Sequence, residues 1–199
     1  DIEARLLARH LPRHVAGTPA IVVQNMGGAA GLVATKYLGE VAPRDGSMAG
    51  YMTAATHRAA FQPERFAVDF RTYEFVGYAA NGRIHFMRTD VKPGIKSPAD
   101  LMKAEGLVAG GLGAEGVKDL SMRLILDMLG VPYKYVTGYN SSTQATLALE
   151  RGEFAYLSDS PSMYLARVEP TLVKAGKVIP VFTEPGFDGT RFVMPKQLQ

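Results

Sequence analysis

The residues whose types and spacing come closest to a ligand-binding motif are Gly111-Leu112-Gly113-Ala114-Glu115-Gly116. They match the pattern G-x-G-x-x-G and lie between an expected strand at 106–110 and an expected helix at 115–129. Glycines in this position expose backbone N–H groups at a helix N-terminus, which suits a phosphate or a carboxylate. A dinucleotide site also needs an acidic residue at the end of the next strand, about twenty positions further on. The next expected strand, 133–137, runs into Thr137-Gly138-Tyr139-Asn140 and offers no acid there. The loop is therefore interpreted as a carboxylate site, with a nucleotide-dependent α/β enzyme kept as the alternative.

Two more polar segments follow expected strands. One is Tyr139-Asn140-Ser141-Ser142-Thr143, and the other is Ser158-Asp159-Ser160. In open parallel sheets, ligands bind at the carboxyl ends of the strands. These segments thus predict a binding cleft at that edge, although Ser and Asn there could equally serve only as helix caps.

Metal binding and catalysis are not indicated. His10 and His14 lie four residues apart, but no third ligand is placed and Pro12 distorts the turn between them. His57 and His85 are isolated, and the default interpretation is a core or surface role. No G-x-S-x-G, H-E-x-x-H or G-K-[ST] motif is present, so nothing assembles a nucleophile with a base. We expect no enzyme activity, no metal and no cofactor.

The elements that must position these loops follow from hydrophobic periodicity and from turn residues. The first part of the chain predicts helices at 2–15 and 29–40 and strands at 20–24, 48–52 and 73–78. The second part alternates regularly: strands at 84–88, 106–110, 133–137, 154–157 and 178–182, with helices at 115–129, 142–151 and near 161–168. This alternation is typical of α/β proteins with sheets rich in parallel strands.

Composition narrows the class further. The 199 residues include 22 basic and 19 acidic side chains, a net charge of +3, and the basic residues are scattered rather than clustered. Nucleic-acid binding is therefore not indicated. No segment approaches the ~18 consecutive apolar residues of a membrane helix. Cysteine is absent, which excludes disulfides and thiolate chemistry.

The order and spacing of several segments resemble one family, the receptors of tripartite tricarboxylate transporters, which are the TctC/Bug-type extracytoplasmic solute-binding proteins. The similar segments are Asp1–Leu11, Gly17–Gly31, Ala42–Gly46, Tyr73–Gly77, Ser97–Leu101, Gly138-Tyr139 and Glu150–Glu153. Family members carry further segments before Asp1 and after residue 199, so the chain is expected to be truncated at both ends. It also lacks a proline after Asn25-Met26, and Glu115 stands where a small or hydroxyl residue is common.

The resemblance implies a periplasmic binding protein with two hinged lobes (a Venus flytrap) that closes on a small organic anion. Lobe 1 would comprise residues 1–80, lobe 2 residues 81–182, and residues 183–199 would return toward lobe 1. The ligand would be a di- or tricarboxylate or an aromatic acid, the partners would be membrane transporter subunits, and the protein would be an exported bacterial monomer. The implied ligand-binding residues are Asp1, Thr53, Ala54, Ala55, Thr56, Gly111, Gly113, Ala114, Glu115, Gly116, Tyr139, Asn140, Ser141, Ser158 and Asp159.

Overall fold

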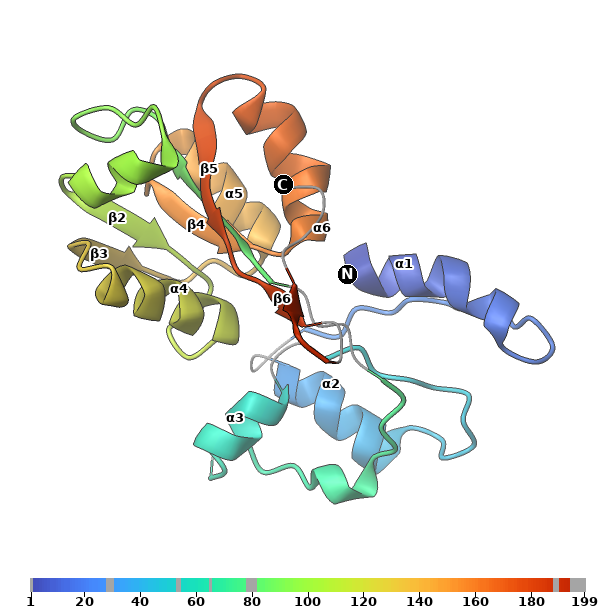
Figure 1. Ribbon diagram of the computed structural model, residues 1–199. Helices are drawn as coiled ribbons and strands as arrows, with labels where there is room; N and C mark the ends of the chain where they lie inside the picture. Colours follow the sequence, from blue (N-terminus) through green and yellow to red (C-terminus); the bar gives the residue numbers. More distant parts are fainter. Residues whose placement is uncertain are drawn as a thin grey trace. The chain divides into compact units, whose positions relative to one another are not determined.

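The structure is a computed structural model, and it describes residues 2–27, 31–52, 55–64, 66–77, 82–187 and 190–193. The chain divides into two compact units, Asp1–Gly77 and Tyr78–Gln199. We refer to them as the N-terminal unit and the C-terminal unit, and describe each by itself (Figure 1).

The N-terminal unit is built from short helices. They are α1 (Ile2–His10), a 3-10 turn (Leu11–His14), α2 (Leu32–Lys36) with a π-helical continuation (Tyr37–Val41), α3 (Ala55–Phe61) and a 3-10 turn (Phe70–Thr72). Pro12, which lacks an N–H, lies where the α-helix gives way to the 3-10 turn. Thr35 is fully buried, and its carbonyl oxygen accepts a hydrogen bond of 2.6 Å from the Tyr73 hydroxyl.

The three strands expected in this unit are not formed. The structure assigns no strand to the described residues of 20–24, 48–52 or 73–78, so that expectation is wrong for this part of the chain. A strand requires a hydrogen-bonded neighbour, and apolar periodicity alone does not supply one.

The C-terminal unit contains a five-stranded sheet with the order β3-β2-β4-β1-β5. The strands are β1 (Ile84–Arg88), β2 (Leu107–Gly110), β3 (Tyr133–Val136), β4 (Tyr156–Asp159) and β5 (Val178–Thr183). Strand β2 is parallel to β3 and β4, whereas β1 is antiparallel to both β4 and β5. The sheet is therefore mixed, and the expectation of a parallel-rich sheet is corrected: β1 runs against its two neighbours because the chain enters the sheet at the edge where β4 ends. A short ladder of β6 (Gly186–Phe187) and β7 (Phe192–Val193) follows.

Helices cover both faces of this sheet (Figure 1). Helix α4 (Val117–Met128) packs on one face, where Met122 and Leu126 join a core with Met87 of β1. On the other face lie α5 (Ser142–Arg151) and α6 (Pro161–Met163) with its π-helical continuation (Tyr164–Val173). There Leu149 packs with Phe86. Successive residues of β1 thus serve opposite cores, as the period of two in a strand requires.

The chain enters and leaves this sheet side by side. Ile84 at the start of β1 pairs with Thr183 at the end of β5. Directly beyond that pair, the Glu184 N–H donates a 2.8 Å hydrogen bond to the Arg83 carbonyl oxygen. A Cβ on Gly82 would meet the Glu184 carbonyl, so the two segments approach as closely as a glycine permits.

Candidate functional site

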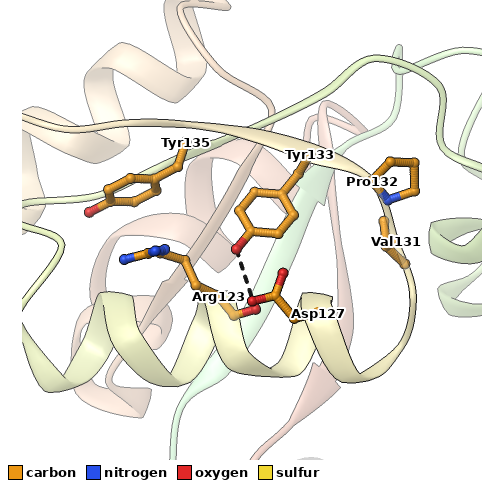
Figure 2. A pocket seen from close by; sticks show the side chains of 6 residues that line it. All are labelled: Arg123, Asp127, Val131, Pro132, Tyr133 and Tyr135. Carbon is orange, nitrogen blue, oxygen red and sulfur yellow. Dashed lines mark hydrogen bonds between the residues drawn. The ribbon is translucent and has the colours of Figure 1, made fainter.

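An open hollow lies on the outer side of α4 and β3 (Figure 2), lined by Arg123, Asp127, Val131, Pro132, Tyr133 and Tyr135. Its polar groups have partners within the chain. The Arg123 guanidinium lies 5.1 Å from the centre of the Tyr135 ring, and the Tyr133 hydroxyl donates to the Arg123 carbonyl at 3.4 Å. These contacts tie α4 to the edge strand, and the hollow is a weaker candidate than the region described next.

The polar edge of the sheet is the better candidate. We use this name for the loop 111–116, the loop 137–142, residues 158–162, residues 82–83 and Glu184, together with the first turn of α4. Strands β2, β3 and β4 end here. Because Ile84 pairs with both Asp159 and Thr183, β1 begins and β5 ends at the same edge. Carboxyl ends of strands in an α/β sheet are where such proteins bind ligands.

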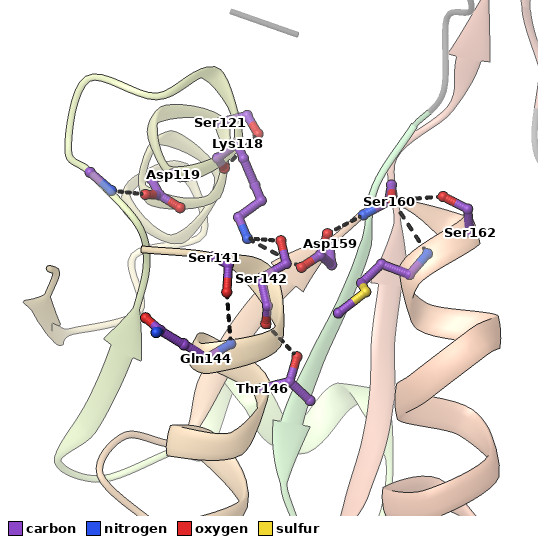
Figure 3. A network of polar contacts seen from close by, with 12 residues as sticks. Lys118, Asp119, Ser121, Ser141, Ser142, Gln144, Thr146, Asp159, Ser160 and Ser162 are labelled. Atoms are coloured by element: carbon purple, nitrogen blue, oxygen red, sulfur yellow. Dashed lines mark hydrogen bonds and ion pairs between the residues drawn. The ribbon is translucent and has the colours of Figure 1, made fainter. Parts of the chain in front are cut away.

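Lys118 crosses the polar edge from α4 to the other face of the sheet (Figure 3). Its Nζ donates to Asp159 Oδ2 at 3.2 Å and to Ser142 Oγ at 3.3 Å. The other oxygen of Asp159 accepts the Ser160 N–H at 2.8 Å. The Ser160 hydroxyl lies 3.0 Å from that of Ser162. One lysine thereby links the starts of α4 and α5 to the end of β4.

The glycine-rich loop wraps around a carboxylate of the chain itself. Asp119 is 1% exposed and accepts the Gly113 N–H at 2.6 Å and the Tyr135 hydroxyl at 3.0 Å. A Cβ on Gly111 would come within 2.5 Å of the Asp119 carboxyl carbon, which explains the glycine there. Burial, reinforced by the Asp119 charge, raises the pKa of Tyr135 to about 12 and keeps its hydroxyl a donor. The Gly113 N–H, which a nucleotide phosphate would need, thus already donates its hydrogen bond to the Asp119 side chain.

A second buried network lies beside this loop. The His85 ring is fully buried; its Nδ1 is 2.9 Å from the Tyr156 hydroxyl and its Nε2 is 3.0 Å from Glu184 Oε1. Glu184 also accepts hydrogen bonds from Ser121 at 2.9 Å and from Arg83 at 3.3 Å. The network therefore joins β1, β4 and α4 to the segment that leaves the sheet.

The charge states in this network follow from burial. Burial lowers the pKa of His85 and outweighs the opposing effect of Glu184. Burial also opposes ionisation of Glu184, but the hydrogen bonds from His85 and Ser121 and the Arg83 charge outweigh it, so the pKa of Glu184 is lowered. Burial raises the pKa of Tyr156. A neutral His85 then accepts from Tyr156 at Nδ1 and donates from Nε2 to the Glu184 carboxylate.

Some of the residues named from the sequence meet at the polar edge. Asp159 pairs with Lys118, and Ser158 beside it is fully buried with no hydrogen-bond partner for its Oγ among the described residues. Ser141 caps α5 by accepting the Gln144 N–H at 3.2 Å, and the Asn140 N–H donates to the Gln144 side chain at 2.9 Å. The capping role that the sequence left open for Ser141 is present.

Other named residues lie elsewhere or outside the description. The Tyr139 ring packs on Phe154, with 5.4 Å between ring centres, and its hydroxyl donates to Glu153 at 2.9 Å, so it does not join the Lys118 contacts. Ala114 and Glu115 are exposed in the loop, and the Gly116 N–H closes the loop onto the Gly113 carbonyl at 2.9 Å. Asp1, Thr53 and Ala54 lie outside the described residues; Ala55 and Thr56 begin α3, but their side chains are not described.

Sequence reasoning missed the residues that organise this edge. Lys118 and Glu184 were not singled out, Ser142 was named only as part of the polar segment 139–143, and His85 was assigned only a default role. A usable signal existed for Lys118, which follows the last glycine of the motif by two positions and therefore faces the same edge. No group of three or more His, Cys, Asp or Glu that could hold a metal occurs among the described residues. None of the helices in the described part of the chain is long and apolar enough to cross a membrane.

The comparisons with known proteins concern the fold. No family model and no curated protein matches the sequence. Among solved structures, the periplasmic binding protein BugD matches with a TM-score of 0.67 and 17% identity, over 92% of this chain and 60% of that one. The R. palustris protein Rpa4515, solved with adipate, matches with a TM-score of 0.67 and 24% identity over the same shares of the two chains. A protein described as a periplasmic transporter matches with a TM-score of 0.64, 22% identity, and 92% and 61% of the two chains.

The chain has the fold of Bug periplasmic binding proteins. It spans about 60% of the length of the Bug-type structures it matches. A periplasmic-binding-protein fold, as the sequence resemblance implied, is confirmed over this matched part, and the two-lobed arrangement stays a prediction. Of these neighbours, BugD is described as a periplasmic binding protein and another as a periplasmic transporter.

Proposed function

We propose that this chain belongs to an extracytoplasmic solute-binding receptor that captures a small organic carboxylate and delivers it to membrane transporter subunits. The observation that carries the proposal is the Bug-type fold over 92% of the chain. Support for the ligand class comes from Rpa4515, whose structure was solved with adipate. The donor-rich polar edge fits such a ligand, because hydroxyl and N–H groups bind carboxylates.

The proposed receptor is a Venus flytrap with two lobes. Residues 1–80 contribute to lobe 1, residues 81–182 form lobe 2, and residues 183–199 return toward lobe 1. The ligand lies between them, and the protein works as a monomer in the periplasm. The residues proposed to face the ligand remain those named from the sequence. Those that lie at the polar edge are Gly111, Gly113, Ala114, Glu115, Gly116, Tyr139, Asn140, Ser141, Ser158 and Asp159. Asp1 and residues 53–56 are proposed for the other lobe.

The alternative, a nucleotide-dependent enzyme, gains no support from the geometry. The Gly113 N–H already binds the buried Asp119 carboxylate at 2.6 Å. A phosphate or a carboxylate at the same donor would lie against that negative charge, which costs free energy in a buried site, so Gly113 contacts the proposed ligand through atoms other than its N–H.

A thermal-shift screen of the intact protein tests the proposal. The panel contains C4–C8 dicarboxylates, citrate, benzoate and NADH. A ligand present at a hundred times its dissociation constant stabilises the folded state by about 2.7 kcal/mol, which shifts the melting temperature by several degrees. We expect a rise with one class of carboxylate and none with NADH. A rise with NADH alone would replace the receptor by the enzyme.

A further inference from the structure

The Lys118 ammonium has hydrogen-bonding capacity that the polar edge leaves unused. An ammonium carries three N–H donors. Two acceptors are recorded for it among the described residues, Asp159 Oδ2 at 3.2 Å and Ser142 Oγ at 3.3 Å. The Lys118 side chain is 18% exposed, whereas Asp159 beneath it is 6% exposed. Solvent, or a ligand, therefore reaches the lysine but hardly reaches its partner.

The position of this ammonium suits a ligand. It lies over the end of β4, between the first turns of α4 and α5 (Figure 3). Ser158, the residue before Asp159 in β4, is fully buried and its hydroxyl has no partner among the described residues. The Arg83 guanidinium at the same edge is bound to Glu184 at 3.3 Å. Lys118 is thus paired with Asp159 at the end of β4, whereas Arg83 is paired with Glu184 in the segment that leaves the sheet.

The contacts of Asp159 keep the ammonium in place. Its two oxygens are divided between Lys118 and the Ser160 N–H at 2.8 Å. Lysine has a flexible four-carbon stem, so an unheld ammonium would lose more side-chain entropy on binding a ligand. With Asp159 and Ser142 fixing two of its donors, the third points in a fixed direction before the ligand arrives.

We propose that Lys118 anchors one carboxylate of the ligand through its third N–H, and that Asp159 is a positioning residue that holds the ammonium. This inference rests on the proposed function and adds to it the residue that makes the site select a negatively charged ligand. Lysine to carboxylate is a charge-assisted hydrogen bond in a partly desolvated site, the stronger kind of such contacts. Analogues in which this carboxylate is replaced by an uncharged amide are bound more weakly for the same reason.

Isothermal titration calorimetry on the intact protein tests this inference. Lys118→Met is compared with the wild type and with Lys134→Met, which removes an exposed lysine of β3. The probe is the carboxylate from the C4–C8, citrate and benzoate panel that binds the wild type most tightly. We expect the dissociation constant to rise about tenfold or more in Lys118→Met and to stay within about twofold of the wild type in Lys134→Met.

A second pair of variants covers a folding defect in Lys118→Met, which leaves Asp159 buried without its partner. Asp159→Asn keeps the ammonium, and Asp159→Asn combined with Lys118→Gln removes it without leaving an unpaired charge. The combined variant should bind about tenfold more weakly than Asp159→Asn alone. Equal affinities of the wild type and Lys118→Met, or of Asp159→Asn and the combined variant, overturn the anchor role while leaving the proposed receptor function intact. If the wild type binds no member of the panel, the receptor and the anchor role both fall.

Discussion

At the residue scale, Glu184 connects side chains that are distant in the sequence. It accepts hydrogen bonds from Arg83, His85 and Ser121. Glu184→Ala leaves the buried His85 Nε2–H without an acceptor. We expect it to lower the free energy of unfolding by about 2–4 kcal/mol, because an orphaned buried donor and a broken charge pair both cost stability. Urea unfolding measures this, and Ser121→Ala, which removes one bond, should cost about 1 kcal/mol. Equal losses in the two variants would contradict the central role of Glu184.

The same network makes stability depend on pH. The pKa of His85 is lowered from 6.5 and that of Glu184 from 4.5. Between the folded and unfolded pKa values, the unfolded state binds more protons, so the free energy of unfolding rises with pH. Stability should be full above pH 6.5 and fall as the pH drops from 6.5, first through His85 and then, below 4.5, through Glu184.

Urea unfolding between pH 5 and pH 7.5 tests this dependence. His85→Asn should flatten the slope, whereas His14→Asn, at an exposed position, should leave it unchanged. A slope that survives in His85→Asn would place its origin elsewhere.

At the scale of the elements, the two glycines of the loop before α4 should respond differently. A Cβ on Gly111 would lie 2.5 Å from the Asp119 carboxyl carbon, whereas a Cβ on Gly113 would meet nothing within 4 Å. Gly111→Ala should cost about 1–3 kcal/mol of stability through overpacking.

Gly113→Val should change stability by less than about 1 kcal/mol, yet weaken carboxylate binding by crowding the loop. Calorimetry and urea unfolding separate the two effects; unchanged affinity in Gly113→Val places the loop outside the site.

The elements that the sequence could predict are those with local signals. Residues 84–88 and 142–151 form β1 and α5 with the expected bounds. A Ser N-cap and a Gly152 C-cap in the left-handed region mark both ends of α5. Long-range pairing has no such signal, which is why the strands expected at 20–24, 48–52 and 73–78 are not formed and why the antiparallel direction of β1 was not predicted. The Lys118 contacts likewise join residues 24 and 41 positions apart.

At the scale of the whole molecule, the proposed lobes predict a change in shape. If a carboxylate is held between two lobes, binding should close them and reduce the radius of gyration in small-angle X-ray scattering. The ligand chosen from the thermal-shift panel serves as the probe, and Lys118→Met at the same ligand concentration serves as the control. A radius that stays constant with saturating ligand would argue against closure between lobes.

The segments that lead into and out of the five-stranded sheet lie next to each other, with the Glu184 N–H bonded to the Arg83 carbonyl at 2.8 Å. Residues 83–184 therefore have the topology of an inserted domain, because the chain enters and leaves them at neighbouring points. Domains whose ends are close together can be inserted, exchanged or permuted with little disturbance to their surroundings. For the proposed receptor, recombination with a related protein would replace the proposed lobe 2 and its half of the binding site in one step, and so alter which solute is recognised without changing the other half.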